Sequence, residues 1–457
     1  MNLNVVILAA GKGSRMVSNL PKVLQPLAKK PLLSHVLTTS LNLKANKVIV
    51  VYGHGGDLVR ETIDEIFADA PIVWVEQKEQ LGTGHAVQQA IPELEPGTRT
   101  LILYGDVPLV TEASLNSFMG ETATDGCGVL TVKLEDAAGY GRIIRDDSYH
   151  VTQIVEEKDA TDAQRQIREV NTGIMLVNTD LLAKWLPLLS NDNAQGEYYL
   201  TDIIKMANDE HVSVNATIVS DPMEVEGVND KVQLANLERL YQQSRARDLM
   251  IAGATLADPH RVDIRGNVKV GKDCFIDVNN VFEGEVSLGE NVQIGPNCLI
   301  INSQIGDNVV IQANSILEDV LVSASCQVGP FARLRPGTQL HQGAKVGNFV
   351  ETKKSVIGEG SKVNHLSYVG DSILGKNVNV GAGTITCNYD GVNKHQTRIG
   401  DNAFIGSNSS LVAPVEIGEG ATIGAGSTIA KNAPPDKLTL TRAKQLTLAG
   451  WKRPVKK

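Results

Sequence analysis

The chain has 457 residues, of which 42% are hydrophobic and 21% are charged, and its formal net charge is -9. The length suggests two to four domains, each large enough to bury its own core. The acidic balance argues against a general binder of nucleic acid, although local basic residues leave phosphorylated small molecules possible as ligands. The five cysteines are odd in number and form no CxxC pair, which predicts reduced thiols in a cytoplasmic protein.

The first 230 residues alternate apolar, strand-like runs with helical patterns. The run at 5–10 is short and lacks the basic residues that precede a signal core, so it is predicted to be a buried parallel strand. Further strands are predicted at 47–52, 72–76, 101–104 and 128–133, and helices at 32–42 and 84–90. This alternation predicts an α/β domain with a mostly parallel sheet, whose ligands bind at the carboxyl ends of the strands. No stretch approaches the roughly 20 apolar residues that cross a membrane.

The sequence LAAGKGSRM at residues 8–16 follows the first predicted strand. Its glycines would let backbone N–H groups approach phosphates closely, and Lys12 and Arg15 add positive charge. The segment is not a Walker A loop, and Met16 stands where a full GxGxxG would have its third glycine. A Pro-Lys pair that ends at Lys22 follows shortly afterwards. We therefore predict a phosphate-binding loop.

Asp106 follows the strand predicted at 101–104, where a carboxylate would face the ligand crevice. A hard oxygen ligand of this kind suits Mg²⁺, and the amide oxygen of Asn229 would complete the protein's share. The alternative is a helix N-cap or turn role for Asp106, which the neighbouring glycine loop makes the weaker interpretation. The sequence therefore predicts Mg²⁺ at Asp106 and Asn229.

Residues 230–252 predict one amphipathic helix, because Leu234, Leu237 and Tyr241 follow helical spacing among charged neighbours. Beyond it, an apolar residue followed by glycine repeats in a register of six. The pairs begin at residues 270, 288, 294, 305, 328, 346, 357, 369, 374, 380, 399, 405, 417 and 423. This period predicts a parallel β-helix with one inward apolar side chain per hexad. We expect the glycines to form tight corners, because glycine adopts backbone angles that other residues avoid.

Departures from the hexad pattern mark candidate site residues, and spacings near 18 stack them on successive coils. Basic and polar residues there suit a phosphorylated sugar, with Arg335 and Lys353 for the phosphate and Tyr368, Asn379, Asn388 and Tyr389 for the sugar. His365 can accept a proton near neutral pH, and the set around it favours a catalytic over a structural histidine. The tail at 431–457 is Pro-rich and then basic, and it is either a solvated tail or an arm that contacts ligand.

The loop at 8–16 with its Pro-Lys pair resembles the signature of sugar-phosphate nucleotidyltransferases. Further segments match that family, namely EQLGTGHA at 79–86, YGDVP at 104–108, GYGR at 139–142, NTG at 171–173 and EGVN at 226–229. Together with the hexads, the whole chain resembles the bacterial family of bifunctional N-acetylglucosamine-1-phosphate uridyltransferases and glucosamine-1-phosphate N-acetyltransferases. The resemblance implies a Rossmann-like α/β nucleotidyltransferase domain at 1–230, a linker helix at 231–252, and a left-handed parallel β-helix with a tail at 253–457. The left hand comes only from the resemblance, since most crossover connections are right-handed.

The resemblance also implies roles in the first domain. UTP would react with N-acetylglucosamine 1-phosphate, and the uridine nucleotide would be held by Leu8, Ala9, Ala10, Gly11, Lys22, Gln77, Gly82, Thr83, Tyr104, Gly105 and Asp106. The acetylamino sugar would be held by Gly141, Glu156, Asn171 and Asn229. No protein nucleophile is needed, so Lys22 would position phosphates and Arg15 would steady the leaving pyrophosphate.

In the second domain, the resemblance implies transfer of an acetyl group from acetyl-CoA to glucosamine 1-phosphate, ahead of uridylyl transfer. His365 would be the general base, and Glu351 would orient it. Acetyl-CoA would be held by Ala382, Ser407, Ala425 and Arg442. The family's β-helices form homotrimers that share acetyl sites between subunits, and the product, UDP-N-acetylglucosamine, is a precursor of bacterial envelope polymers.

Two other interpretations concern the β-helix. It would be a regulatory or oligomerising module on a nucleotidyltransferase, which the residues around His365 argue against. Alternatively, it would be a histidine-metal hydratase or an inert scaffold. The histidines available there show no evident three-histidine spacing; they are His260, His341, His365 and His395.

Overall fold

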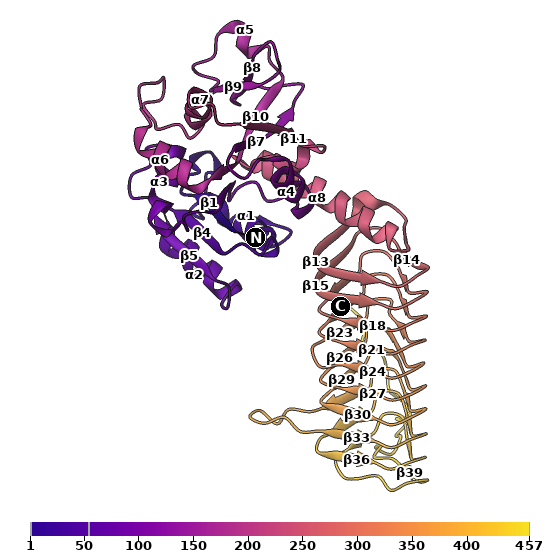
Figure 1. Cartoon of the computed structure of the whole chain (residues 1–457). Coiled ribbons are helices and arrows are strands. Elements are labelled where there is room, and N and C mark those ends of the chain that lie inside the picture. The colour runs from indigo at the N-terminus through magenta and orange to yellow at the C-terminus, as the bar shows by residue number, and fades with distance from the viewer. Residues whose placement is uncertain (1, 54, 457) are drawn as a thin grey trace. The chain divides into compact units, whose positions relative to one another are not determined.

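The computed structural model describes residues 2–53 and 55–456. The chain divides into two compact units, Met1–Tyr241 and Gln242–Lys457. The first is an α/β unit, and the second is a column of stacked β coils (Figure 1).

The first unit is built on a nine-stranded sheet. Seven of its strands lie side by side in the order β11-β7-β10-β6-β1-β4-β5, and the other two are β8, which pairs with β10, and β9, which pairs with β8. Strands β1 (Leu3–Ala9), β4 (Lys47–Tyr52), β5 (Ile72–Glu76) and β6 (Arg99–Tyr104) are parallel. Strand β10 (Glu169–Asn178) runs antiparallel to β6 and to β7 (Cys127–Lys133). The remaining strands of the large sheet are β8 (Arg142–Arg145), β9 (Val151–Val155) and β11 (Val214–Ile218). Strands β2 (Pro26–Leu27) and β3 (Lys30–Pro31) form a separate two-stranded sheet. The predicted mostly parallel α/β sheet is confirmed.

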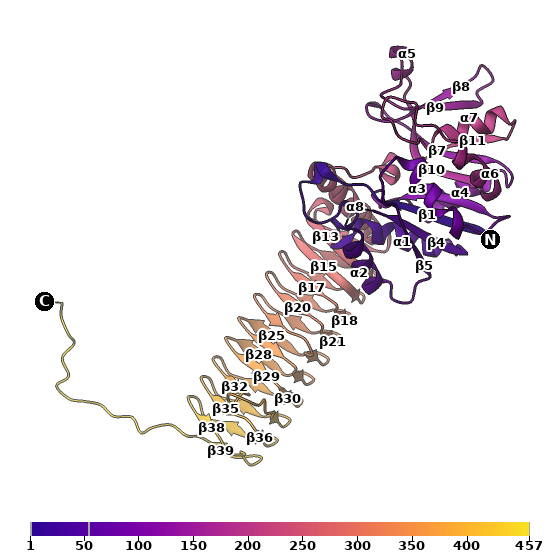
Figure 2. The same ribbon diagram turned by 90° about the vertical axis from the view of Figure 1, so that its left-hand side faces the viewer.

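Helices pack on both faces of this sheet, because successive residues of a buried strand point to opposite faces. Val5 and Ile7 face a core shared with α1 (Leu32–Asn42), α2 (Gly56–Ile66) and α4 (Glu112–Glu121). Val6 and Leu8 face a core shared with α3 (Thr83–Ala90), α6 (Thr179–Trp185) and α7 (Asp202–Asp209). A one-turn helix, α5 (Asp162–Arg165), lies outside these layers (Figure 2).

Strand β1 has β4 on one side and β6 on the other. The chain moves outward from β1 to β4 and β5 and then crosses back to β6, so the strand order reverses between β1 and β6. In open α/β sheets, ligands bind at the carboxyl ends of the strands at such a reversal. The fold therefore places a ligand crevice after Ala9 of β1 and Tyr104 of β6.

Helix α8 (Lys231–Ile251) forms where an amphipathic helix is predicted. Leu237 is buried, and Leu234 and Tyr241 pack partly buried against the same small cluster of the first unit. The boundary between the two units falls inside this helix. In the second unit, Gln242 accepts a hydrogen bond from the backbone N–H of Ile264 at 2.6 Å and donates to its carbonyl at 3.1 Å.

The second unit is a parallel β-helix of short strands that form two long sheets (Figure 2). The eleven-stranded sheet contains β12 (Ala254–Leu256), β14 (Cys274–Ile276), β16 (Gln293–Ile294), β19 (Val310–Ile311), β22 (Gln327–Val328), β25 (Lys345–Asn348), β28 (Lys362–His365), β31 (Asn379–Val380), β34 (Phe404–Ile405), β37 (Thr422–Ile423) and β39 (Leu438–Thr439). The seventeen-stranded sheet contains β13 (Val262–Val270), β15 (Asn280–Leu288), β17 (Leu299–Ile301), β18 (Gln304–Ile305), β20 (Ile316–Glu318), β21 (Leu321–Val322), β23 (Arg333–Leu334), β24 (Gln339–Leu340), β26 (Glu351–Lys353), β27 (Val356–Ile357), β29 (Tyr368–Gly370), β30 (Ser372–Leu374), β32 (Ile385–Cys387), β33 (Thr397–Ile399), β35 (Ser410–Val412), β36 (Val415–Ile417) and β38 (Thr428–Ile429). A loop at residues 388–396 stands out from the coils between β32 and β33 (Figure 1).

The inward apolar side chains of the hexads are confirmed, but the reason predicted for their glycines is wrong. The apolar residues that precede these glycines are buried, except for Val270, which is partly buried. Among the hexad glycines, only Gly329 has a positive φ. Instead, a Cβ on Gly347 or on Gly358 would lie 2.0 Å from a carbonyl oxygen of the next coil. Glycine is needed because the stacked coils approach one another closely.

The described part of the chain contains no helix that is long and apolar enough to span a membrane. All five cysteines lie in that part and are free thiols, as predicted. Residues 440–456 have exposed side chains and no helix or strand. Thr441 still bonds to Ser427 and Thr428, and the chain beyond Arg442 leads away from the coils (Figure 2).

Candidate functional sites

A cavity of about 470 Å³ lies at the carboxyl ends of β1 and β6. Ten residues predicted to hold the uridine nucleotide line it: Leu8, Ala9, Ala10, Gly11, Lys22, Gln77, Gly82, Thr83, Tyr104 and Asp106. Gly105 is the predicted residue that does not line it, and a Cβ there would lie 3.2 Å from Val23. The structure therefore brings this set together from four separate segments of the sequence.

The glycine-rich loop folds over Lys22. Gly13 has a φ of 58°, and a Cβ on it would lie 2.7 Å from the Cβ of Lys22. Both the backbone angle and the close approach therefore require glycine at this position. Lys22 begins a short 3-10 helix, Lys22–Leu24, that directs its side chain into the cavity lining.

Four polar residues converge beside this cavity. Lys22 Nζ donates a hydrogen bond to Asp106 Oδ2 and lies 3.4 Å from Asn229 Oδ1. Arg15 Nη2 donates to the same Asn229 oxygen at 3.0 Å. The side chains of Lys22 and Asp106 are 14% and 16% exposed, so their attraction is only partly screened by water. The two oxygens predicted to bind Mg²⁺ thus face one ammonium group.

Three residues predicted to hold the acetylamino sugar lie together where β8, β9 and β10 meet. The backbone N–H of Asn171 donates to the carbonyl of Gly141 at 2.8 Å, and a Cβ on Gly141 would lie 3.3 Å from Glu156 Oε1. Thr201 Oγ1 donates to the same Glu156 oxygen at 3.1 Å. Burial raises the pKa of Glu156, and neighbouring carboxylates add to the effect. Asn229, the fourth predicted residue, lies with the cationic group described above.

Tyr104 lies near both groups of residues. Burial raises the pKa of its hydroxyl, and the charges of Glu156 and Asp106 raise the pKa further. Its ring packs against Gly173, which has a φ of 86° and on which a Cβ would lie 2.5 Å from Tyr104 Cε2. The glycine of the segment NTG is therefore explained by the position of Tyr104.

Sequence analysis did not assign Gln80 and Glu197 to the site, although both line the cavity. Gln80 lies within the matched segment at 79–86, so a signal existed, and its Nε2 donates to the carbonyl of Gln77 at 3.1 Å. Glu197 has no motif of its own. It reaches the site because Gly82 leaves room for the Glu197 side chain and the Tyr198 backbone, since a Cβ on Gly82 would lie 3.0 Å from Glu197 Cβ and 2.7 Å from the carbonyl oxygen of Tyr198.

The second candidate site lies on the coils around residues 335–388. Arg335 Nη1 donates to Glu351 Oε1 at 2.7 Å, and Glu351 pairs in register with Tyr368 on the next coil. Lys394, from the protruding loop, lies against Lys353 and, together with Arg335, lowers the pKa of Lys353. Three cations therefore gather here, as a phosphate requires, and Lys394 is one that the sequence analysis missed.

Tyr368 and Asn388 share a space that only glycine leaves open. Asn388 Nδ2 donates to Asp371 Oδ2 at 2.5 Å and lies 3.5 Å from the hydroxyl of Tyr368. A Cβ on Gly370 would lie 2.4 Å from that hydroxyl and 2.8 Å from Asn388 Nδ2. The structure thus joins these two predicted sugar residues directly.

The other two predicted sugar residues lie elsewhere on the chain. Asn379 is on β31 of the eleven-stranded sheet, where it pairs with Lys362. Tyr389 is 60% exposed at the base of the protruding loop, and its hydroxyl bonds to the carbonyl of Gly391.

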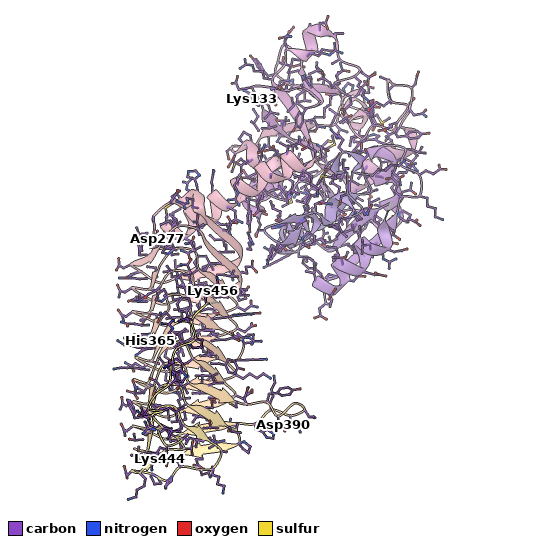
Figure 3. All side chains as sticks on the ribbon, turned by 180° about the vertical axis from the view of Figure 1, so that it is seen from behind. Lys133, Asp277, His365, Asp390, Lys444 and Lys456 are labelled. Carbon is purple, nitrogen blue, oxygen red and sulfur yellow. The ribbon has the colours of Figure 1, made fainter. Side chains whose placement is uncertain are left out.

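His365 ends β28 and is exposed on the side of the coils, whereas Asp390 marks the protruding loop (Figure 3). The Nδ1 atom of His365 lies 2.8 Å from Asn348 Oδ1. The hydrogen-bond partner of His365 in the structure is thus Asn348, whereas Glu351, predicted to orient His365, accepts a hydrogen bond from Arg335.

The residues predicted to hold acetyl-CoA form one ladder along a corner of successive coils. The backbone N–H of Asn408 donates to the carbonyl of Ala382, and that of Gly426 donates to the carbonyl of Ser407, both at 2.8 Å. A Cβ on Gly406 would lie 2.5 Å from the backbone nitrogen of Ala425. A Cβ on Gly424 would lie 3.6 Å from Arg442 Nη2 on the last coil. The ladder holds Ala382, Ser407, Ala425 and Arg442 in that order.

Family models match both units. The MobA-like NTP transferase domain matches residues 5–198, the GMPPB C-terminal domain matches 261–340, and the bacterial transferase hexapeptide (six repeats) matches 396–431. Fold and sites together define a Rossmann-like nucleotidyltransferase joined to a hexapeptide-repeat transferase, whose coils form a left-handed parallel β-helix.

Full-length relatives give the family. The chain is 57% identical over 454 residues to the bifunctional protein GlmU of Marinobacter nauticus, covering 99% of both chains. It is 59% identical over 455 residues to GlmU of Saccharophagus degradans, covering 100% of both, and 55% identical to GlmU of Idiomarina loihiensis over 457 residues. The chain belongs to the GlmU family. It is a bifunctional enzyme with an acetyltransferase and a uridyltransferase activity, which together make UDP-N-acetylglucosamine.

Proposed function

We propose that the cavity at the carboxyl ends of β1 and β6 is the site of uridylyl transfer from UTP to N-acetylglucosamine 1-phosphate. The observation that carries this proposal is the position of Tyr104, which lines the nucleotide cavity while its ring packs against Gly173, whose N–H donates to Oδ1 of the predicted sugar residue Asn171. Nucleotide and sugar would therefore bind on either side of one side chain.

Mg²⁺ fits this site by the chemistry of its donors. Asp106 Oδ2 accepts a hydrogen bond from the ammonium group of Lys22, and Asn229 Oδ1 lies within reach of the same group, so both oxygens face a point that suits a cation. Among the described residues there is no group of three or more His, Cys, Asp or Glu side chains that could hold a metal ion. Mg²⁺ usually takes one or two carboxylates and completes its shell with substrate phosphates and water. Bound there, it would neutralise charge on the triphosphate.

In this proposal the sugar phosphate oxygen attacks the α-phosphorus of UTP in line, and the bond to pyrophosphate breaks. Lys22 holds phosphate oxygens, Arg15 steadies the leaving pyrophosphate, and the N–H groups of the glycine loop cradle the chain of phosphates. No side chain forms a covalent bond to the substrate, because positioning and charge stabilisation supply most of the acceleration in phosphoryl-type transfer.

We assign acetyl transfer to the coils around His365. The imidazole Nε2 takes a proton from the amine of glucosamine 1-phosphate as that nitrogen attacks the thioester carbonyl of acetyl-CoA, and CoA leaves as a thiolate. Arg335, Lys353 and Lys394 would bind the phosphate. The sugar would contact Tyr368, Asn379, Asn388 and Tyr389, and acetyl-CoA would lie along the ladder that ends at Arg442.

We also propose a homotrimer. Phe331, Phe349 and Leu366 follow one another at one corner of successive coils and are 50%, 56% and 62% exposed, and the two phenyl rings stack 5.3 Å apart. An exposed apolar row of this kind suits a protein interface. Light scattering on the full chain should give three times its mass of 49.0 kDa, and a monomer would refute the proposal.

Two further expectations belong to the same proposal. The functional boundaries would be 1–230 for uridylyl transfer, 231–252 for the linking helix and 253–457 for acetyl transfer. The enzyme would act in the cytoplasm on small-molecule substrates, in keeping with its free thiols.

Two single substitutions in the full chain test the assignment of the sites. Asp106→Ala should abolish uridylyl transfer and leave acetyl transfer intact, and His365→Ala should do the opposite. Pyrophosphate release and CoA release report the two reactions in the same preparation. Normal uridylyl transfer by Asp106→Ala, or normal acetyl transfer by His365→Ala, would refute the corresponding assignment.

A further inference from the structure

His365 is held by one contact that the proposed mechanism does not use. Its ring nitrogen Nδ1 lies 2.8 Å from the side-chain oxygen Oδ1 of Asn348, on the preceding coil. Among the residues that the structure describes, no group hydrogen-bonds to the other ring nitrogen, Nε2. The Nδ1 edge of the ring is thus bound to Asn348, and the Nε2 edge is available to a substrate.

The chemistry of the pair fixes which nitrogen carries the proton. An amide oxygen accepts hydrogen bonds and cannot donate them, so Nδ1 of the neutral ring must carry the hydrogen. Nε2 is then the unprotonated nitrogen, which is the form that a general base requires. Without this contact, the neutral ring would also populate the form with the hydrogen on Nε2, which cannot accept a proton there.

The fold holds Asn348 in this position through its backbone. Asn348 pairs in register with His365 between β25 and β28, and its carbonyl accepts the N–H of Leu366 at 3.0 Å. Gly347 lets the two coils meet closely, since a Cβ there would lie 2.0 Å from the carbonyl oxygen of Asn364. The residue directly before Asn348 therefore sets the short distance between the two coils.

The nearby carboxylate is engaged elsewhere. Glu351 is three residues beyond Asn348, but Arg335 donates to it at 2.7 Å. We propose that Asn348 is the positioning residue of His365, and that Glu351 positions Arg335 for the phosphate instead. This inference rests on the proposed role of His365 as the general base.

The side chain that holds His365 is the neutral amide of Asn348 and not a carboxylate. It orients the ring and stabilises the imidazolium that forms as the amine attacks, but it adds no negative charge beside the free base. A carboxylate would hold the proton more firmly and would keep more of the ring protonated near neutral pH.

The test compares pH profiles of acetyl transfer for Asn348→Ala and Asn348→Asp in the full chain. Loss of the oriented hydrogen bond in Asn348→Ala should lower kcat by about 10- to 100-fold, with a smaller change in KM. Asn348→Asp keeps the size and the acceptor, so it should retain more activity, and the acidic limb of its kcat/KM profile should move to higher pH. Uridylyl transfer in the same preparation checks that each variant is folded.

Two controls separate this inference from its neighbours. Asn364→Ala removes an amide beside the same pair of strands and should leave the acidic limb in place, and Glu351→Gln should raise KM for glucosamine 1-phosphate without moving that limb. An unchanged profile in both Asn348 variants, or a shifted limb in Glu351→Gln, overturns the role of Asn348. If His365→Ala itself retains acetyl transfer, the proposed function fails instead.

Discussion

The contact between Gly173 and Tyr104 makes a quantitative prediction about the uridyltransferase unit. Gly173 has a φ of 86° within the irregular part of β10, and its N–H donates to Asn171 Oδ1 at 2.9 Å. A methyl group on Gly173 would lie 2.5 Å from Cε2 and 2.8 Å from Cζ of Tyr104. Gly173→Ala therefore strains the backbone and pushes a ring that lines the cavity.

The cost has two parts. Left-handed backbone angles cost an alanine about 1–2 kcal/mol. Forcing a methyl group into a packed site usually costs a further 1–3 kcal/mol or so, because the ring must leave its preferred position. We expect a total loss of roughly 2–5 kcal/mol in the free energy of unfolding of the first unit, which corresponds to about 2–4 °C of its unfolding temperature per kcal/mol for a unit of this size.

Gly97 provides a matched control in the same unit. It has a φ of 69°, and nothing lies within 4 Å of a Cβ placed on it. Gly97→Ala should therefore show only the backbone part, about 1–2 kcal/mol, with normal uridylyl transfer. Gly173→Ala should in addition lower kcat/KM for N-acetylglucosamine 1-phosphate by about tenfold or more. A rise of about 1.4 kcal/mol in the activation free energy already corresponds to that factor.

Calorimetry and steady-state assays of pyrophosphate release measure both effects, and CoA release tests the second unit. Acetyl transfer should be unchanged in both variants. The reasoning is refuted if the two substitutions lower the unfolding temperature equally, or if Gly173→Ala retains normal uridylyl transfer. Either result would mean that Tyr104 is free to move away without consequence.

Three further results are expected. Gly370→Ala should lower acetyl transfer with little loss of stability, because its methyl group would displace the ends of the Tyr368 and Asn388 side chains rather than backbone; a large fall in the unfolding temperature would contradict this. Glu156→Gln should stabilise the first unit relative to the unmodified chain, because a raised pKa in the folded state means that the charged form is disfavoured there. The difference should grow as pH rises from the ordinary Glu pKa of about 4.3 to the raised pKa of the folded state, and then level off. Urea unfolding across pH measures this difference, and a constant difference would contradict it. Removal of Mg²⁺ by a chelator should stop uridylyl transfer and spare acetyl transfer, and loss of both would contradict the metal assignment to Asp106.

The architecture could be predicted because its signals are local. The apolar runs at 47–52 and 72–76 form strands with the same bounds. The first is buried on both faces, and the second is only partly buried at the edge of the sheet. The hexads likewise predict the β-helix, because burial of one residue in six leaves a period that neither a helix nor an ordinary strand produces. Most segments that line the nucleotide cavity were also visible, since each follows a strand or lies in a matched motif, whereas Glu197 does neither.

The partners within each site could not be predicted in the same way. Arg335 and Asn348 lie 16 and 17 residues from their partners Glu351 and His365, a span that crosses one coil in each case. Spacings near 18 show only that such residues lie on neighbouring coils. Which side chains meet depends on where each corner turns, and coils here vary in length by a residue or more. Lys394 was missed for a similar reason, because its loop interrupts the register.

In the β-helix, glycine connects the fold to the site through close approach rather than through unusual backbone angles, whereas Gly13 and Gly173 of the first unit combine close approach with a positive φ. Gly347 brings two coils together, and the pair directly after it is Asn348 with His365. Gly370 leaves the space in which Tyr368 meets its amide partner, and its φ is not positive. A substitution at such a glycine therefore acts on the ligand-facing residue of the neighbouring coil or strand. The geometry of the proposed acetyltransferase site therefore depends on Gly347 and Gly370, because each glycine sets the distance between two functional side chains.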